Sequence, residues 1–482
     1  MSFTIRATLE VPQEISKIFL IQNTEQLKDF MFSETEIEYI EKKYQENEKD
    51  KSPLVIIKRL SQILAVVKPT TDEPLEIIKE RMRRRGAEIL SGLKAEKNEK
   101  AAIIDLISNP PLTLALAEGL ALNAYSFNKY KTGEKNSLNY EFLIVSPQVK
   151  GCDIAKLTRV IEAVYLARDL VNEPVGYLNA EKLGELVLEY AEKFGFKAEV
   201  FNKKKIESLK MGGLLAVNKG SIDPPTFSVL EWKPENAVNS KPYVIAGKGV
   251  MFDTGGVNLK TPPGSLDTMK CDMGGAASVI GTMAAVAANE LPVHVIGLIP
   301  ATDNRLGGHA IVPGDILKMH NGLTVEVINT DAEGRLILAD ALSFSKKYDP
   351  ELVIDLATLT GNAAIAIGIH GIVAMGTAPQ NVQNELNNAG DEVCERLVWF
   401  PFWEDYDKSI KSDIADIKNL GEREGGAISA GKFLGKFVDA PWVHLDIAGP
   451  AYVMAATDYR PTGGTGVGVR LLYQFFNSKS SK

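Results

Sequence analysis

The sequence predicts two α/β domains joined by a long helix, the second of them built on a mostly parallel central sheet flanked by helices. With 482 residues the chain is too long for one ordinary domain. From residue 178 onward, segments with helical spacing alternate regularly with short apolar runs. These runs are apolar throughout and do not alternate with polar residues, which is typical of parallel strands buried on both faces.

The first domain is expected to span residues 1–150. Apolar runs predict strands at 16–21, 54–57 and 63–67. Helical spacing predicts helices at 76–93 and 112–124. This region contains no catalytic motif, so we expect it to serve assembly or regulation.

Four arginines form a cluster within the first predicted helix: Arg81, Arg83, Arg84 and Arg85. Basic clusters of this kind can contact the phosphates of nucleic acids. Glutamates at positions 76, 80 and 88 surround this one, which predicts a solvated helix face instead. The net charge of -8 also argues against a nucleic-acid surface along the chain.

A linking helix is expected within residues 151–176. Apolar residues recur at helical spacing from 154 to 171. The helix should stop at Asn172-Glu173-Pro174, because proline cannot continue it and restrains the residue before it.

The second domain is expected to span residues 177–482. Its predicted strands are 243–248, 293–299, 323–329, 352–356, 372–375 and 442–446. Its clearest predicted helices are 180–194, 274–289 and 336–348.

The composition is that of a cytoplasmic globular protein, with 45% hydrophobic and 24% charged residues. Its three cysteines are far apart and odd in number, which predicts reduced thiols and no disulfide framework. The N-terminus lacks the basic start and apolar core of a signal peptide. The most apolar run, 273–288, is too short and too rich in small polar residues to span a bilayer, so no membrane partner is expected.

Residues 329–336, Asn-Thr-Asp-Ala-Glu-Gly-Arg-Leu, connect a predicted strand to a predicted helix. Ligands bind at such carboxyl ends of strands in open α/β sheets. In extended backbone, Asp331, Glu333 and Arg335 would share one side. Two buried anions this close repel each other unless a cation or a shared proton compensates, which predicts a metal site. An acidic turn can also simply cap the next helix.

Further charged residues favour the metal site. Lys248 and Asp253 follow the strand predicted at 243–248, and Lys260 and Asp272 come soon after. Four carboxylates at the mouths of a sheet supply the hard oxygen ligands of one or two divalent ions. Of the five histidines, His294 and His444 fall in predicted strands as core residues, and no H-E-x-x-H motif occurs, so a histidine-ligated zinc protease is not expected.

The 329–336 stretch resembles the signature of the leucyl aminopeptidase (cytosol aminopeptidase) family. Further blocks resemble the family in the family's order: 247–256, 269–277, 355–361, 425–431 and 444–449. Residues 168–174 resemble its connector, and the resemblance covers residues 160–475. One eight-residue block with several ordered partners is far more specific than a single short motif.

The resemblance implies a two-metal exopeptidase. Lys248, Asp253, Asp272 and Glu333 match the ligands of the more tightly held ion. Asp253, Asp331 and Glu333 match those of the exchangeable ion, and Lys260 and Arg335 match the two catalytic residues that bind no metal. The native ions are expected to be Zn²⁺ or Mn²⁺, although such a site also accepts Co²⁺ or Mg²⁺.

The implied mechanism uses each residue type for a physical reason. A hydroxide bridging the two ions attacks the scissile carbonyl, which Lys260 polarises. Arg335 presents a planar fork that suits bicarbonate, the proton-shuttling base of the family. The free α-amine of the substrate binds a metal, which restricts cleavage to the N-termini of peptides.

The expected first side-chain pocket is apolar and suits leucine-like residues. The residues that match it are Thr358, Leu359, Gly361 and Ala448. Two departures from the family pattern leave the preference open: the loop containing Pro262-Pro263-Gly264 is one residue longer, and Asp303-Asn304 stands where Glu-Asn is more common.

The resemblance also implies a homohexamer whose active sites face an interior cavity. Parts of the sequence are also consistent with three other functions: a two-metal phosphoesterase, a DNA-binding or regulatory role of residues 1–150, and an inactive relative. The ordered blocks do not resemble a phosphoesterase, and the intact set of metal and catalytic residues argues against inactivity.

Overall fold

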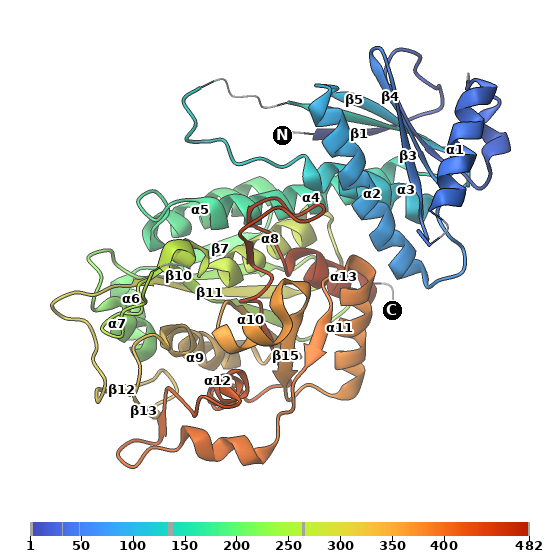
Figure 1. Ribbon diagram of the computed structural model, residues 1–482. Helices are drawn as coiled ribbons and strands as arrows, with labels where there is room; N and C mark the ends of the chain where they lie inside the picture. The colour runs from blue at the N-terminus through green and yellow to red at the C-terminus, as the bar shows by residue number, and fades with distance from the viewer. Residues whose placement is uncertain (1–2, 31, 48, 134–137, 263–265, 481–482) are drawn as a thin grey trace. The chain divides into compact units, whose positions relative to one another are not determined.

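The computed structural model describes residues 3–30, 32–47, 49–133, 138–262 and 266–480. The chain forms two compact units (Figure 1). The first comprises Met1–Ile161 together with Ala455–Thr462, and the second comprises Glu162–Met454 together with Gly463–Lys482. Both have a sheet with helices, which confirms the predicted α/β class.

The first unit contains a six-stranded sheet of order β1-β6-β5-β2-β4-β3, in which only β3 runs antiparallel to its neighbour. Its strands are β1 (Phe3–Thr8), β2 (Ser16–Leu20), β3 (Leu54–Arg59), β4 (Gln62–Val67), β5 (Lys100–Asp105) and β6 (Tyr140–Val145). Its helices are α1 (Glu34–Glu46), α2 (Leu75–Ala95) and α3 (Pro110–Asn123). The predicted strands correspond to β2, β3 and β4, whereas β1, β5 and β6 were not predicted.

The arginine cluster on α2 is not simply a solvated face, and this prediction is wrong for Arg83. Arg83 is only 2% exposed, and its Nε donates to Glu118 Oε2 on α3 at 2.6 Å. Arg85 is paired with Asp50 and Glu88. These guanidinium groups are therefore engaged by carboxylates within the unit.

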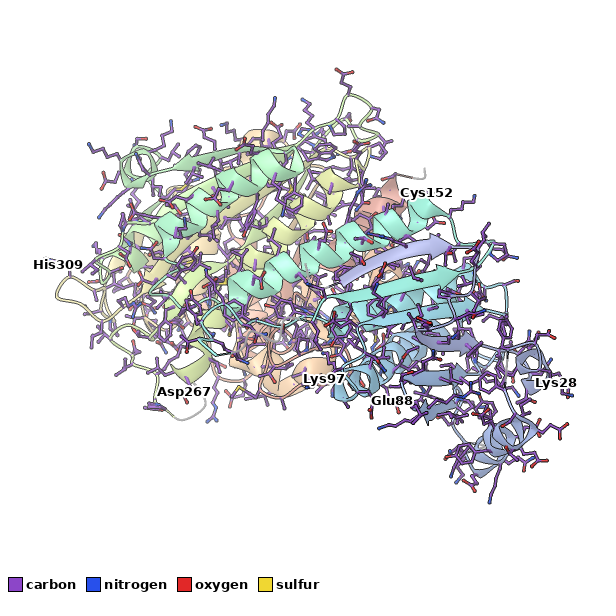
Figure 2. The ribbon with its side chains drawn as sticks, turned by 90° about the horizontal axis from the view of Figure 1, so that it is seen from above. Lys28, Glu88, Lys97, Cys152, Asp267 and His309 are labelled. Atoms are coloured by element: carbon purple, nitrogen blue, oxygen red, sulfur yellow. The ribbon has the colours of Figure 1, made fainter. Side chains whose placement is uncertain are left out.

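Helix α4 (Gly151–Asn172) covers the predicted linking helix and extends it at the N-terminal end. Cys152 lies exposed in its first turn (Figure 2). The other two cysteines are also free, as the sequence predicted.

The second unit contains a nine-stranded sheet of order β16-β15-β18-β14-β9-β11-β8-β7, with β10 also paired to β11. Its strands are β7 (Lys197–Phe201), β8 (Thr226–Trp232), β9 (Tyr243–Gly247), β10 (Gly249–Asp253), β11 (Val295–Asn304), β14 (Leu352–Ala357), β15 (Ile372–Gly376), β16 (Leu397–Trp399) and β18 (Trp442–Asp446). The central neighbours β18, β14, β9, β11 and β10 are mutually parallel, which confirms the mostly parallel sheet.

Helices flank this sheet (Figure 1). They are α5 (Ala180–Phe194), α6 (Lys203–Ser208), α7 (Gly212–Asn218), α8 (Gly274–Ala288), α9 (Glu333–Ser345), α10 (Gly361–Ile367), α11 (Gln380–Val393), α12 (Gly426–Gly435) and α13 (Val469–Lys479). Helix α8 is buried along its whole length, since its small residues allow close packing against β9 and β14. Among the described residues one segment, Leu266–Ala288, is long and apolar enough to cross a membrane, and 94% of its apolar window is buried in the protein.

The strand predicted at 323–329 is wrong in extent and place. Only Thr324–Glu326 form a strand, β13, which pairs with β12 (Ile316–Lys318) and β17 (Ile417–Lys418) in a separate three-stranded sheet. Ile328 is 37% exposed, so the apolar run is covered on one side only. A second small sheet pairs β19 (Tyr452–Val453) with β20 (Gly463–Gly464).

A buried carboxylate ties α9 to its surroundings. Asp340 on α9 is fully buried, and it accepts hydrogen bonds at 2.9 Å from the backbone N–H groups of Leu214 and His320. The helix that begins at Glu333 is thereby fixed against α7 and the segment that precedes β13.

We expect Asp340→Ala to lower the free energy of unfolding by about 3 kcal/mol, because it leaves buried N–H groups without an acceptor. Urea denaturation compares it with Asp439→Ala, which removes the exposed partner of Lys346 and should cost about 0.5 kcal/mol at most. Equal effects of the two substitutions would contradict the assigned role of Asp340.

Candidate active site

The predicted site residues gather at one edge of the second unit's sheet. Lys248 directly follows β9, Thr358 directly follows β14, and Asp253 is the last residue of β10. Because these strands are parallel, their carboxyl ends meet at the same edge, where α/β sheets bind ligands. Glu333 reaches this edge from the first turn of α9.

Lys248 is the buried centre of one half of the site. Its Nζ lies 2.7 and 2.8 Å from the two carboxylate oxygens of Asp272 and 3.0 Å from Glu333 Oε1. It also donates to the main-chain oxygen of Thr358 at 3.0 Å. A side chain at Gly334 would overlap the Lys248 aliphatic chain, so glycine is required there for this approach.

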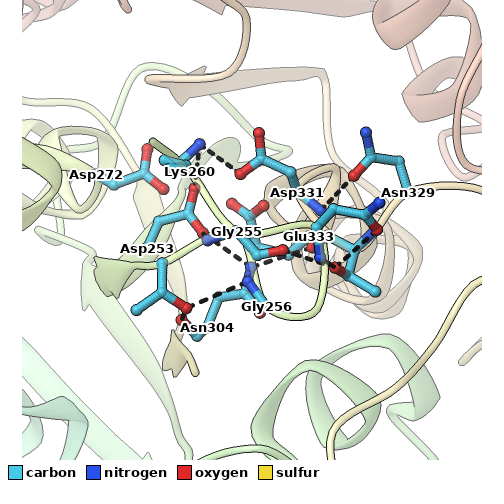
Figure 3. Close-up of polar contacts among 12 residues, drawn as sticks. Asp253, Gly255, Gly256, Lys260, Asp272, Asn304, Asn329, Asp331 and Glu333 are labelled. Carbon is cyan, nitrogen blue, oxygen red and sulfur yellow. Dashed lines mark hydrogen bonds and ion pairs between the residues drawn. The ribbon is translucent and has the colours of Figure 1, made fainter. Parts of the chain in front are cut away.

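Lys260 occupies the other half (Figure 3). Its Nζ lies 2.8 Å from Asp253 Oδ2 and 2.5 Å from Asp331 Oδ1. The chain reaches it through a tight turn in which Gly255 has a φ of +85° and donates its N–H to Asp253 Oδ1 at 2.8 Å. The two lysines thus divide the carboxylates between them.

The donor set fits divalent metal ions. Carboxylate oxygens of Asp253, Asp331 and Glu333 all lie within 4.8 Å of one another. Glu333 is 1% exposed, and its Oε2 finds no hydrogen-bond partner among the described residues. A buried, unpartnered carboxylate oxygen beside two further acidic groups provides what a hard cation needs.

Burial and mutual repulsion perturb these groups. Burial, with the nearby charge of Asp253, raises the pKa of Glu333 to about 8. Burial likewise raises the pKa of Asp272 to about 6, against the opposing effect of Lys248. Burial disfavours the charged forms of Lys248 and Lys260, but the surrounding carboxylates prevail and raise both pKa values. The site therefore holds protons that a metal ion would displace.

Arg335 is a buried cation with a free donor. Its Nη1 donates to the main-chain oxygen of Asn419 at 2.8 Å, whereas its Nε has no partner among the described residues. Burial lowers its pKa to about 10, although Glu333 and Asp446 act in the opposite direction. It remains charged at neutral pH and can accept a small anion.

Asn304 connects two parts of the site (Figure 3). No role was predicted for it from the sequence. Its Nδ2 donates to Asp253 Oδ1 at 2.8 Å and to the main-chain oxygen of Thr330 at 3.1 Å. Its place at the carboxyl end of β11 was the available signal, but the length of that strand was underestimated. Asp303 beside it is paired with Arg305 at 2.6 Å and does not line the site cavity.

A cavity of about 700 Å³ opens onto the charged cluster. It is lined by four of the five predicted metal ligands, by both predicted catalytic residues, and by all four predicted pocket residues: Lys248, Asp253, Asp272, Asp331, Lys260, Arg335, Thr358, Leu359, Gly361 and Ala448. The fifth, Glu333, is 1% exposed and is not part of the lining. The cavity also includes residues for which no role was predicted, among them Met269 and Asn329 of the family-like blocks and Leu420 outside them.

Histidines do not contribute to the described lining of this cavity. His444 is fully buried and bonded to Asp355 at 2.6 Å, and His294 contacts Glu231 at 3.0 Å, so both are core residues as predicted. His309 lies on an exposed loop after β11 (Figure 2). The site is built from carboxylates and amines.

The local geometry around Asp331 differs from the prediction. The expected extended run ends early, because α9 begins at Glu333 and not at residue 336. Glu333 and Arg335 therefore occupy a helical turn and do not share one side of a strand. Of the lengthened loop, Pro263 and Gly264 lie outside the described residues.

Comparison with known proteins identifies the family. The model of the cytosol aminopeptidase family, catalytic domain, matches residues 165–473. A probable cytosol aminopeptidase of Chloroherpeton thalassium is 43% identical over 411 residues, which cover 81% of this chain and 79% of that protein. A probable cytosol aminopeptidase of Clostridium perfringens is 40% identical over 84% of each chain.

Solved structures agree with these relatives. A mutant of tomato leucine aminopeptidase superposes with a TM-score of 0.85 at 26% identity, covering 99% of this chain and 96% of that one. The bottromycin maturation enzyme BotP in complex with Mn gives a TM-score of 0.84 at 27% identity, covering 97% and 99%. The chain belongs to the cytosol aminopeptidase family and is a metal-dependent aminopeptidase.

Proposed function

We propose that this enzyme removes leucine-like, apolar residues from the free N-termini of peptides with two divalent metal ions. The observation that carries the proposal is the cluster of four acidic residues and two lysines at the 700 Å³ cavity, all of them buried except Lys260 and Asp331, which are partly exposed. Lys248, Asp253, Asp272 and Glu333 would hold one ion. Asp253, Asp331 and Glu333 would hold the other.

The bound ions would supply an activated water for attack on the peptide carbonyl and a docking point for the substrate's α-amine. The protein's own residues supply the remaining functions. Lys260, which lies beside Asp253 and Asp331, would donate to the carbonyl oxygen as negative charge develops there, when bound metal ions engage those two carboxylates. Arg335 would hold bicarbonate as the proton-accepting base, through its unused Nε–H.

Side-chain selection is proposed to depend on Thr358, Leu359, Gly361 and Ala448. These residues are apolar or small at the cavity surface, apart from Thr358, whose hydroxyl already donates to Asp272 at 2.7 Å. An apolar substrate side chain gains free energy by leaving water there, whereas a charged one would lose its hydration.

We propose the remaining assignments on the family relationship. Residues 1–150 would serve assembly or regulation, residues 151–176 would link them to the catalytic domain at 177–482, and the enzyme would act in the cytoplasm as a homohexamer. Mn²⁺ is the first metal to test, because the related BotP was solved with Mn. Zn²⁺ is the second, followed by Co²⁺ and Mg²⁺.

Chelator treatment should abolish hydrolysis of leucyl p-nitroanilide, and Mn²⁺ or Zn²⁺ should restore it. N-acetyl-leucyl p-nitroanilide should resist cleavage throughout, because its blocked nitrogen cannot bind a metal. Absorbance of released nitroaniline measures both reactions. Equal cleavage of the acetylated substrate would rule out an aminopeptidase, and no cleavage by metal-loaded enzyme would rule out the leucine preference.

Lys260→Ala should lower kcat for leucyl p-nitroanilide by about 100-fold or more, because one donor to the developing oxyanion is lost. Mn²⁺ binding, measured by calorimetry, should persist, since Lys260 is not a proposed ligand. Lys346→Ala, on the exposed surface, is the matched control and should leave kcat unchanged. A Lys260 variant with wild-type kcat would exclude the proposed role.

Ala448→Leu should reduce kcat/KM for the leucyl substrate by about tenfold relative to the alanyl substrate, since the added side chain fills part of the apolar pocket. The ratio of the two kcat/KM values is the measurement, because it cancels general losses of active enzyme. An unchanged ratio would place side-chain selection elsewhere in the cavity.

A further inference from the structure

We propose that Asn419 is a positioning residue that holds the Asn329–Asp331 segment and Arg335 in register with each other. Asn419 follows β17 directly and is fully buried. It lies between the three-stranded sheet of β12, β13 and β17, here called the side sheet, and the first turn of α9. The 329–336 block connects β13 of this sheet to α9 and includes that first turn.

The side chain of Asn419 fixes the backbone that leads to Asp331. Its Oδ1 accepts the N–H groups of Ile328 at 2.8 Å and Asn329 at 3.3 Å. Its Nδ2 donates to the main-chain oxygen of Asn329 at 2.8 Å. One amide therefore satisfies three backbone groups on two successive residues just beyond β13, where no strand pairing continues.

Asn329 passes this constraint on to the acidic residue. Its Oδ1 accepts the N–H of Asp331 at 2.8 Å (Figure 3), and its main-chain oxygen also accepts the N–H of Ala332 at 3.2 Å. The turn that presents the Asp331 carboxylate thus rests on a residue whose own backbone is held by Asn419.

The main chain of Asn419 holds the second element. Its carbonyl accepts a hydrogen bond from Arg335 Nη1 at 2.8 Å, and its N–H donates to the main-chain oxygen of Glu326 on β13 at 2.9 Å. The backbone at 419 is thereby tied to both the guanidinium and the side sheet. A shift of the Asn329–Asp331 segment would therefore also move the Arg335 contact.

The chain offers a matched control in Asn239, another buried asparagine of the second unit. Its Oδ1 accepts the N–H of His294 at 2.8 Å, and its Nδ2 donates to the oxygens of Lys241 at 2.8 Å and His294 at 2.9 Å. Asn239 makes the same kind of amide clamp near the amino ends of β9 and β11, away from the site cavity.

The test compares Asn419→Ala and Asn419→Asp with Asn239→Ala by melting temperature, by Mn²⁺ affinity in calorimetry, and by kcat for leucyl p-nitroanilide at saturating Mn²⁺. Both alanine variants should lower the melting temperature. Only Asn419→Ala should also weaken Mn²⁺ binding at the Asp331-dependent site and lower kcat, each by about tenfold or more. Asn419→Asp keeps the acceptor but loses the donor to Asn329, and provides a second variant if the alanine protein does not fold.

A double-mutant cycle with Asp331→Asn identifies the route of the effect. If Asn419 acts through Asp331, its substitution should change Mn²⁺ affinity far less in the Asp331→Asn background than in the wild type. Additive losses, unchanged Mn²⁺ affinity and kcat in both Asn419 variants, or the same losses in Asn239→Ala would each overturn the inference. The kcat readout rests on the proposed function, whereas the Mn²⁺ readout does not, so an inactive wild type would contradict the function alone.

Discussion

The second unit is organised around the repulsion between acidic groups that its sheet forces together. Asp253, Asp272 and the Asp331–Glu333 pair come from three segments, and each is placed at the sheet edge by a strand end, a turn or a helix start. Burial removes the water that would otherwise screen their charges. Lysines inserted between them, a tight glycine turn, and amide groups from Asn304 and Asn419 are all means of holding this arrangement.

The arrangement separates two requirements of catalysis. The carboxylates and Lys248 lie at the base of the cavity and are held by many contacts, as residues that must keep a fixed geometry should be. Leu359, Gly361 and Ala448 line the same cavity, and all three are uncharged. Under the proposed function, substitution of these pocket residues would change substrate selection and leave the charged cluster as it is.

Much of this could be predicted from the sequence, because the relevant signals are local. Helix α5 follows its apolar spacing from Ala180 to Phe194 and ends at Gly195, which adopts a left-handed conformation. The predicted site residues were found from one dense block and its ordered partners, and the cavity lining includes nearly all of them. The family and the α/β class followed from the same signals.

The remaining features depend on long-range contacts that spacing does not encode. The apolar run at 323–329 looks like a central strand, but β13 pairs with β12 and β17 in a separate sheet, and α9 starts at Glu333. Arg83 sits among glutamates like a surface residue, yet α3 covers it. Asn419 carries no local signal at all, since the partners of the hydrogen bonds described above lie 84 to 93 residues away.

The placement of Lys248 and Lys260 has a consequence for the charge balance of the folded chain. Many small metal-binding domains fold only with their ion, because nothing else offsets the charge of their ligands. Here two ammonium groups offset part of the charge of the four carboxylates. Lysine at these two positions therefore lowers the electrostatic cost of bringing the carboxylates together, a cost that a neutral residue of similar length would leave in place.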